Sequence, residues 1–336
     1  MKNITVFTVL VINFFCTQPV MALDNETYAV TLSPRFGMVY GQAEEIVYPY
    51  NTIAPMLSQL LWDINSVFYY GFLLELSRLD PREKWGFFAG FSLRNGIPGS
   101  SGFIENRDWQ STIHADLTDY SIHDNHIREL MLLDFAAGVS FPLNRWLFKT
   151  SVNVSFIRLS FFGTDGQGEY ARQSGSLFHP ITDDPDVLLF SGKVISYTQE
   201  WLYIAPAFSI GYFFRENFLA ELSFIVTPLI LCNALDEHKG SYAWDVKNQA
   251  EALTRNAQFR DYMQGGIMLE PGLMISYVID RRFTVFWEIS WRYINRTRGI
   301  AYSRNPIGFG NYFPALEPSG AGLSGLHNGI GLKVTL

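Results

Sequence analysis

The chain has 336 residues, of which 48% are hydrophobic and 16% aromatic, and its formal net charge is −7 at pH 7. This acidic balance argues against a nucleic-acid partner, which needs a basic protein surface. Beyond the N-terminus no stretch reaches the ~18 consecutive apolar residues of a transmembrane helix, so the apolar content must be arranged differently.

The first 22 residues have the features of a secretory signal peptide. Lys2 supplies the positive end, residues 4–15 form a short apolar run, and Val20-Met21-Ala22 is a suitable cleavage site. We therefore expect residues 1–22 to be removed and residues 23–336 to form a single domain. The domain would carry a charge of −8, because Lys2 is the only charged residue that is lost.

Two cysteines bear on this interpretation. Cys16 leaves open a lipoprotein signal, although the bulky Phe15 before it disfavours that alternative. After cleavage only Cys232 remains, so no intramolecular disulfide can form. We interpret Cys232 as a small apolar strand residue rather than a nucleophile.

Ten stretches after the signal alternate apolar and polar residues, the period of a strand with one oily and one polar face. Short turns and long polar loops separate them alternately, as at the two rims of a bacterial outer-membrane barrel. We therefore predict an all-β, ten-stranded antiparallel transmembrane β-barrel with both termini in the periplasm. The predicted strands are 27–44, 57–78, 83–97, 126–142, 145–163, 193–214, 217–234, 257–279, 282–303 and 320–336.

The connections differ strongly in length. Tight turns are predicted near Asp80-Pro81, Pro142-Leu143-Asn144, Arg215-Glu216-Asn217 and Asp280-Arg281. Long loops are predicted over 45–56, 98–125, 164–192, 235–256 and 304–319.

The direction in which side chains face follows from the alternation. In the strand over 282–303 one face is apolar and rich in tryptophan, whereas the other carries Glu288 and Arg292. We expect the apolar face to contact lipid and the charges to pair inside the barrel, in a network that includes Glu221. We expect five tryptophans to face lipid or to anchor the barrel at the membrane interface. They are Trp62, Trp85, Trp201, Trp287 and Trp291.

Strand length and strand number limit the function. Crossing a bilayer takes ~9–11 tilted residues, so strands of about twenty residues extend beyond the membrane on the extracellular, long-loop side. A barrel of about ten strands is too narrow for a general pore. Bulky and charged inward residues also argue against a small-solute channel, and surface chemistry or adhesion is favoured.

Several motifs lie near the ends of the predicted strands. They are Gly41-Gln42-Ala43-Glu44-Glu45-Ile46-Val47-Tyr48 with Leu57-Ser58-Gln59-Leu60-Leu61-Trp62, Asn106-Arg107-Asp108-Trp109 with Thr118-Asp119-Tyr120-Ser121, Asp236-Glu237-His238, and Gly320-Ala321-Gly322 with Gly331-Leu332-Lys333-Val334-Thr335-Leu336. Each motif is weak alone, but their order and spacing through the mature chain resemble the omptin family of outer-membrane proteases.

The resemblance implies an endopeptidase at the extracellular mouth of the barrel, with water as the nucleophile between a His–Asp dyad and an opposing pair of acids. By position, His238 would be the general base, Asp236 its orienting partner and Asp108 one opposing acid. Asn106 stands where the family has the other Asp, and an amide cannot act as a base. Glu105 is a possible substitute, but strand alternation aims it the other way. The chain is therefore expected to be an omptin-type (aspartic-type) endopeptidase or a catalytically impaired surface adhesin.

The resemblance also implies how substrates bind. Glu45 matches a carboxylate that contacts a basic substrate side chain, whereas the partner of that carboxylate is replaced by Ala234. Asp119 matches another acid that lines the groove. We expect peptide or protein substrates at the cell surface, cleaved next to basic residues, and the resemblance implies no cofactor.

Three further features are weaker. Arg158 matches a family residue that binds lipopolysaccharide, but its companion positions read Phe156 and Val154. Contact with outer-membrane lipid is therefore expected, without a requirement for lipopolysaccharide. His123-Asp124-Asn125-His126 suggests a metal only loosely, because a site needs more ligands, and hydrated histidines are the favoured alternative. No Ser–His pair on one wall indicates a lipase or deacylase.

Overall fold

The computed structural model describes residues 28–50, 53–79, 85–175, 177–238, 242–253, 256–304 and 312–336. All regular elements within these ranges are β-strands, which confirms the predicted all-β class. No helix in the described part is long and apolar enough to cross a membrane. The signal peptide predicted for residues 1–22 and the turn predicted near Asp80-Pro81 lie outside the described residues.

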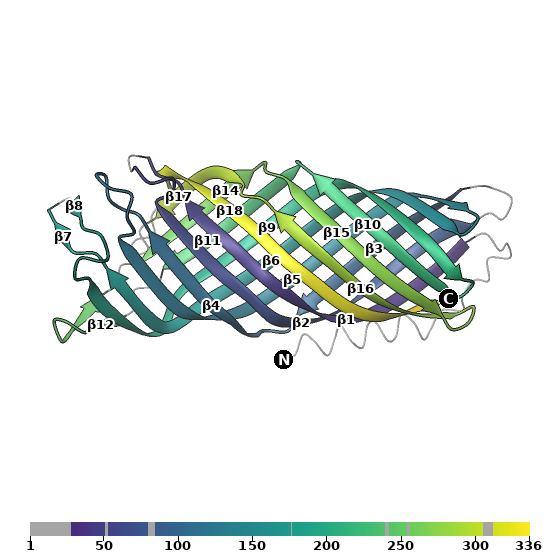
Figure 1. Cartoon of the computed structure of the whole chain (residues 1–336), viewed down its shortest axis with the longest axis horizontal. Coiled ribbons are helices and arrows are strands. Elements are labelled where there is room, and N and C mark those ends of the chain that lie inside the picture. The colour runs from purple at the N-terminus through teal and green to yellow at the C-terminus, as the bar shows by residue number, and fades with distance from the viewer. Residues whose placement is uncertain are drawn as a thin grey trace.

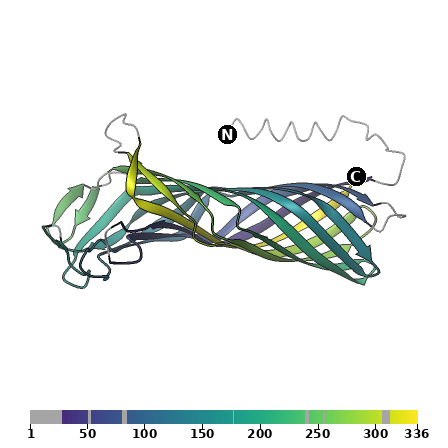
Figure 2. The same cartoon turned by 90° about the horizontal axis from the view of Figure 1, so that it is seen from above.

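Ten of the strands form one closed, antiparallel ring (Figures 1 and 2). The ring closes where the first strand pairs with the last, from Thr31 opposite Thr335 to Val47 opposite Ser319. Its strands, in spatial order, are β1 (Tyr28–Val47), β2 (Ser58–Leu79), β3 (Gly86–Gly96), β5 (Asp119–Leu143), β6 (Trp146–Tyr170), β9 (Asp186–Arg215), β10 (Phe218–Thr227), β15 (Met268–Val278), β16 (Phe283–Ile294) and β18 (Phe313–Thr335).

Four more strands continue the wall beyond short interruptions. The continuations are β4 (Gly99–Asp108) after β3, β11 (Ile230–His238) after β10, β14 (Ala257–Gln264) before β15 and β17 (Arg298–Arg304) after β16. They pair with one another or with the long strands, so the wall extends far along the barrel axis. We call this part the upper barrel; it lies on the left in Figure 1, away from the C-terminus.

Small hairpins lie at the same end. They are β7 (Gln173–Ser174) with β8 (Leu177–Phe178), and β12 (Tyr242–Asp245) with β13 (Ala250–Leu253). The second hairpin continues the wall on the edge of β9. The opposite end has short connections instead, and the turns predicted before Trp146, Phe218 and Phe283 are confirmed.

Several predicted loops are too long. Residues 98–125 were expected to form a loop, but β4 occupies Gly99–Asp108 and β5 already begins at Asp119. The loops predicted over 164–192 and 235–256 also lose their first residues to β6 and β11. In the upper barrel both faces of the wall carry polar residues, so the sequence there does not alternate between apolar and polar residues. The backbone hydrogen bonds between the strands nevertheless continue, and the strands are longer than the sequence predicts.

The facing predicted for the lower strands is correct. On β16, Val285 and Trp291 are 40% and 43% exposed on the outside, whereas Arg292 is 3% exposed. Two predicted lipid anchors are wrong, because Trp62 and Trp201 are fully buried. Trp62 lies on the inner face of the upper barrel and stacks on Tyr197 with 5.3 Å between ring centroids, so it fills the interior instead of anchoring the wall.

The lower interior holds paired charges. Arg292 Nε donates to Glu270 Oε2 at 2.7 Å. Arg35 lies 3.3 Å from Glu288, and Glu221 lies 2.8 Å from Lys149. The predicted internal network around Glu221, Glu288 and Arg292 is therefore present, and it satisfies charges that would be costly to bury alone.

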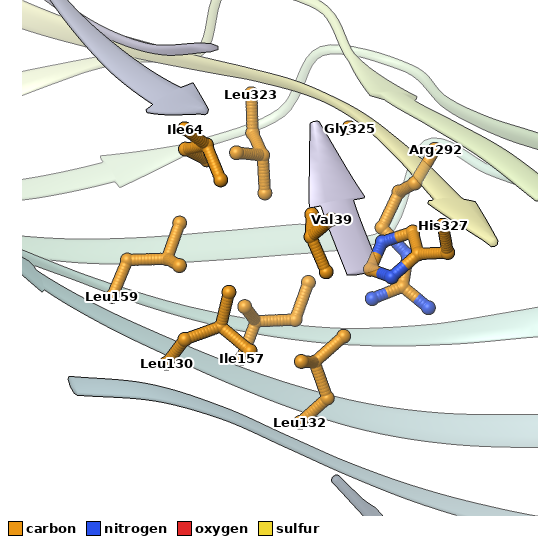
Figure 3. Close-up of a pocket in the computed structure, with 10 residues that line it drawn as sticks. All are labelled: Val39, Ile64, Leu130, Leu132, Ile157, Leu159, Arg292, Leu323, Gly325 and His327. Carbon is orange, nitrogen blue, oxygen red and sulfur yellow. The ribbon is translucent and has the colours of Figure 1, made fainter. Parts of the chain in front are cut away.

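Apolar side chains fill the interior next to this network. Figure 3 shows Leu130, Leu132 and Ile157 on one side of a small cavity, with Arg292 and His327 on the other. The cavity measures about 20 Å³, which is room for about one water molecule.

The buried pair gives a test of how the interior is stabilised. We expect Arg292→Met to lower the free energy of unfolding by about 3–5 kcal/mol, because it leaves the Glu270 carboxylate buried and unpaired. Arg292→Met/Glu270→Met should recover most of the loss, since both charges are then removed. Urea unfolding of the detergent-folded protein, followed by tryptophan fluorescence, measures both. A double variant at least as unstable as the single one would contradict this account.

Candidate active site

The dyad of Asp236 and His238 ends strand β11. Alternation places both side chains on the inner face of the wall, two residues apart. His238 Nε2 lies 2.7 Å from Asp236 Oδ2. The Asp236 side chain is 3% exposed and the His238 side chain 40%, so a buried carboxylate holds an imidazole that reaches solvent. Because β11 is paired with β9 on one side and β14 on the other, the dyad is held rigidly.

The charges around His238 favour its protonated form. Burial lowers the pKa of His238, but the charge and hydrogen bond of Asp236, with a smaller contribution from Asp108, more than compensate. The pKa of His238 therefore stands above its ordinary value of 6.5. A base of this kind is neutral, and able to accept a proton, above its raised pKa.

The opposing wall is strand β4. Asn106 Nδ2 donates to Asp108 Oδ2 at 3.2 Å, and Ser58 Oγ donates to Asn106 Oδ1 at 3.3 Å. Both ends of the Asn106 amide are thus used in fixing Asp108. Burial raises the pKa of Asp108, and the hydrogen bonds and the nearby His238 oppose this shift.

A cleft separates the two walls. It has a volume of about 250 Å³, and both Asn106 from β4 and His238 from β11 line it. This is room for several water molecules. Asn106 and His238 thus line one cleft, and each contacts one of the two predicted acids, Asp108 and Asp236.

Ser121 and His123 also line this cleft, so the expectation that no Ser–His pair lies on one wall is wrong. Ser121 Oγ lies 3.1 Å from His123 Nε2, and His123 Nδ1 lies 2.6 Å from the carbonyl oxygen of Asp165. Since that carbonyl can only accept, Nδ1 carries the proton and Nε2 accepts from the Ser121 hydroxyl. Burial lowers the pKa of His123 and keeps it neutral. The two-residue spacing places both side chains on one face of a strand. The sequence predicts a loop over 98–125, so this spacing alone does not indicate the pair.

The second histidine of that segment lies elsewhere. His126 stacks on Phe162 with 4.9 Å between ring centroids, and its Nε2 lies 3.2 Å from Thr164 Oγ1. Across the described residues, no group of three or more His, Cys, Asp or Glu side chains is placed to hold a metal ion.

The two predicted substrate-binding acids have different surroundings. Glu45, near the end of β1, is 4% exposed, and burial followed by repulsion from Asp236 raises its pKa well above the ordinary value. Asp119 accepts hydrogen bonds from Gln110 Nε2 at 2.6 Å and from the Ala171 amide at 3.0 Å. Burial raises the pKa of Asp119 to about 6. Asp119 therefore ties two loops together, which weighs against its predicted contact with substrate.

Arg158 lies on the outer wall between two carboxylates. Its Nε is 3.0 Å from Glu129, and its Nη1 is 2.5 Å from Glu200. The group carries a net charge of −1 when all three are ionised, which is unfavourable for a phosphate-bearing lipid. Lipid binding by Arg158 stays a prediction, and these two partners weigh against it.

Comparisons with known proteins agree with the geometry. A family model described as "Omptin family" matches residues 26–324. The crystal structure of the outer membrane protease OmpT from Escherichia coli matches with a TM-score of 0.75 at 18% identity, over 92% of this chain and 97% of that one. The toluene transporter TodX of Pseudomonas putida reaches a TM-score of only 0.33 at 10% identity, over 93% and 91% of the two chains, and carries no argument. A search of curated proteins finds no match.

The dyad gives a prediction that does not depend on catalysis. We expect the titration midpoint of His238 to lie above 6.5 and Asp236→Asn to lower it, because burial is then opposed only by the smaller contribution of Asp108. NMR of the histidine-labelled, detergent-folded protein measures both midpoints, with the signal assigned from a His238→Asn sample. Glu237→Gln is the matched control, since this neighbouring acid contacts Ser196 and Gln258 instead. Equal shifts in the two variants would contradict the dyad.

Proposed function

Because this chain belongs to the omptin family, we propose that it is an endopeptidase that hydrolyses peptide bonds with a water molecule activated between His238 and Asp108. One observation carries the proposal. The His238–Asp236 dyad, at 2.7 Å, faces the Asn106–Asp108 pair across a cleft of about 250 Å³. The name of the structurally similar OmpT, an outer membrane protease, supports the same class of reaction.

The proposed chemistry follows from the hydrogen bonds. His238 Nε2 is engaged with Asp236, so neutral His238 has its other ring nitrogen, Nδ1, free to take a proton from water. As that proton moves to His238, the water oxygen bonds to the peptide carbonyl carbon. Asp236 stabilises the resulting imidazolium, which then gives the proton to the departing amine as the C–N bond breaks.

The opposing wall positions the nucleophile. Asp108 accepts a hydrogen bond from water, and Asn106 holds Asp108 in place through its amide nitrogen. Asn106 supplies no second base. One acid–base group is typically worth ~10²–10⁴-fold in rate, so we expect a slower peptidase than one with two acids on this wall.

Substrate choice and location complete the proposal. Glu45 favours a basic residue next to the bond that is cleaved. The family and the fold indicate a bacterial outer-membrane protein. We propose that the upper barrel, which carries the cleft and the longer loops, faces the extracellular side, because short turns belong to the periplasmic rim. Surface peptides or proteins are then the substrates.

A binding protein on the same barrel is the second candidate, and Asn106 is the observation that favours it. A wall with an amide in place of an acid keeps its shape and its hydrogen bonds while it loses base strength. An adhesin would need only the shape of the cleft. Catalytic activity of the natural chain is what separates the two candidates.

We expect detergent-refolded protein to cleave peptides that contain Arg or Lys, and His238→Ala and Asp108→Asn to reduce kcat/KM by about 10²–10⁴-fold. Ser121→Ala should stay within about tenfold of wild type, because water and not the Ser121 hydroxyl is the nucleophile. Peptide cleavage followed by mass spectrometry measures all four proteins. Cleavage no faster than that of His238→Ala would rule out the endopeptidase, and a loss in Ser121→Ala equal to that in His238→Ala would indicate a serine nucleophile.

Asn106→Asp tests how far the chemistry is impaired. At a pH above the pKa of His238 in both proteins, we expect kcat to rise by about tenfold or more, because a second carboxylate helps to hold the water and to stabilise the imidazolium that forms. Asn106→Ala is the control, since it removes the hydrogen bond to Asp108 without adding an acid, and it should lower kcat. If wild type is inactive and only Asn106→Asp cleaves, the natural chain is a binding protein. An unchanged or lower kcat in Asn106→Asp would refute the role given to this position.

A further inference from the structure

An acid that the mechanism does not use lies beside the dyad. Asp261, on β14, is 3% exposed. In the register of β11 and β14 it stands directly opposite Ala234. Directly opposed residues of an antiparallel pair point to the same face, with Cβ atoms about 4.5–5.5 Å apart. Asp261 is therefore on the inner face of the wall, where the side chain of Ala234 ends at its methyl group.

Asp261 belongs to a cluster of three buried acids, which we call the acid pocket: Glu45 from β1, Asp236 from β11 and Asp261 from β14. Their exposed fractions are 4%, 2% and 3%. Their charges act on one another, since both Asp236 and Asp261 repel the Glu45 carboxylate. Three different strands thus contribute to one buried group of acids.

Each acid in the pocket has an unsatisfied oxygen. Glu45 Oε2, Asp236 Oδ1 and Asp261 Oδ1 are buried and have no hydrogen-bond partner of good geometry among the described residues. Trp62 and Ser319 lower the pKa of Glu45 and Asp261 only slightly against the effect of burial. A buried carboxylate oxygen without a donor is costly. In the lower interior, by contrast, the buried acid Glu270 has a cationic partner, Arg292, at 2.7 Å. The acid pocket is arranged for a positive group that comes from outside.

The placement of the three acids favours an organic cation over a metal ion. No three acids in the described chain are placed to hold one metal ion, so a single small ion cannot satisfy them together. A guanidinium or ammonium group on a side chain carries several N–H donors spread over a larger volume. Such a group can satisfy separated carboxylates from different strands at once.

We infer that Asp261 is the second carboxylate of the substrate side-chain pocket and that, with Glu45, it binds the guanidinium or ammonium group of the substrate residue next to the cleaved bond. This inference rests on the proposed peptidase function. The acid missing at Ala234 has been replaced from the neighbouring strand, so the preference for a basic residue is retained.

The electrostatics of the acid pocket support the inference. Burial, followed by repulsion from Asp236, raises the pKa of Asp261 to about 7, and the pKa of Glu45 is also raised. The charge of Asp108, on the opposite wall, also raises the pKa of Glu45. His238 lies next to Asp236. A bound cation favours the ionised acids, so its binding releases protons at neutral pH and weakens as the pH falls below about 7.

The test compares a charged and a neutral side chain of the same shape. Two peptides differ only in one arginine or citrulline, and acetyl-arginine amide and acetyl-citrulline amide serve as probes that need no cleavage. We expect Asp261→Asn to reduce the arginine-over-citrulline preference in kcat/KM, and in calorimetric binding, by about tenfold or more. Asp261→Asn removes repulsion within the pocket, so the variant is expected to fold. Glu251→Gln, at an exposed acid on β13, is the matched control and should keep the preference.

A second variant separates position from charge. Ala234→Asp/Asp261→Asn moves the carboxylate across the strand pair and should restore the preference, which general damage to the fold would not allow. Arginine preference that is unchanged in Asp261→Asn overturns the inference while the proposed function stands. Probe binding that depends on Asp261 without any cleavage overturns the proposed function instead. If acetyl-arginine amide binds no better than acetyl-citrulline amide to wild type, the pocket does not recognise a cation and the inference fails.

Discussion

The closure of a single antiparallel sheet determines where every functional side chain of this protein lies. In a closed ring each strand has a partner on both sides, so its register cannot slip without exposing backbone groups or turning side chains to the wrong face. His238 and Asp236 are fixed in this way between β9 and β14, and Asp108 is fixed between β2 and β5. Catalytic geometry needs tolerances below about an ångström, which a barrel wall provides more readily than a loop.

The barrel buries charge in two different ways. In the lower interior, acids and bases neutralise one another, as Arg292 does with Glu270. In the upper barrel, Glu45, Asp236 and Asp261 leave oxygens without donors. A paired charge stabilises the fold, whereas an unpaired one costs stability unless a ligand compensates for it. The lower interior also has buried polar atoms without a partner, such as Arg292 Nη1, but its acids Glu270, Glu288 and Glu221 pair with cations. Glu45 and Asp261 have no ion pair with the described residues, and this contrast supports the proposal that they bind a ligand.

The sequence allowed the ten-membered ring to be predicted because the lower strands face lipid on one side and a polar interior on the other. The same alternation placed Asp236 and His238 on one face and Arg292 inside. The alternation of apolar and polar residues does not predict the strands of the upper barrel, where the wall no longer faces lipid. There both faces carry polar residues, so the sequence predicts a loop where β4 and the start of β5 lie. It also predicts lipid contact for Trp62, which fills the interior instead. Asp261 was missed for another reason: its role depends on lying opposite Ala234, and register between strands far apart in sequence is not visible in composition or period.

The departures from the family pattern can be understood together. A second acid at position 106 would add a negative charge near His238 and raise the pKa of the histidine further, so the base would be neutral only at higher pH. Asn106 removes that charge and keeps Asp108 in place by a hydrogen bond. Asp261 adds a charge on the other side of Asp236, inside the pocket for a basic side chain. In this proposal the acid missing at Ala234 is compensated by Asp261 on the neighbouring strand, whereas the acid missing at Asn106 is not compensated. If the proposed function holds, the chain is a peptidase that retains recognition of a cationic side chain and gives up part of the acid–base strength at the scissile bond.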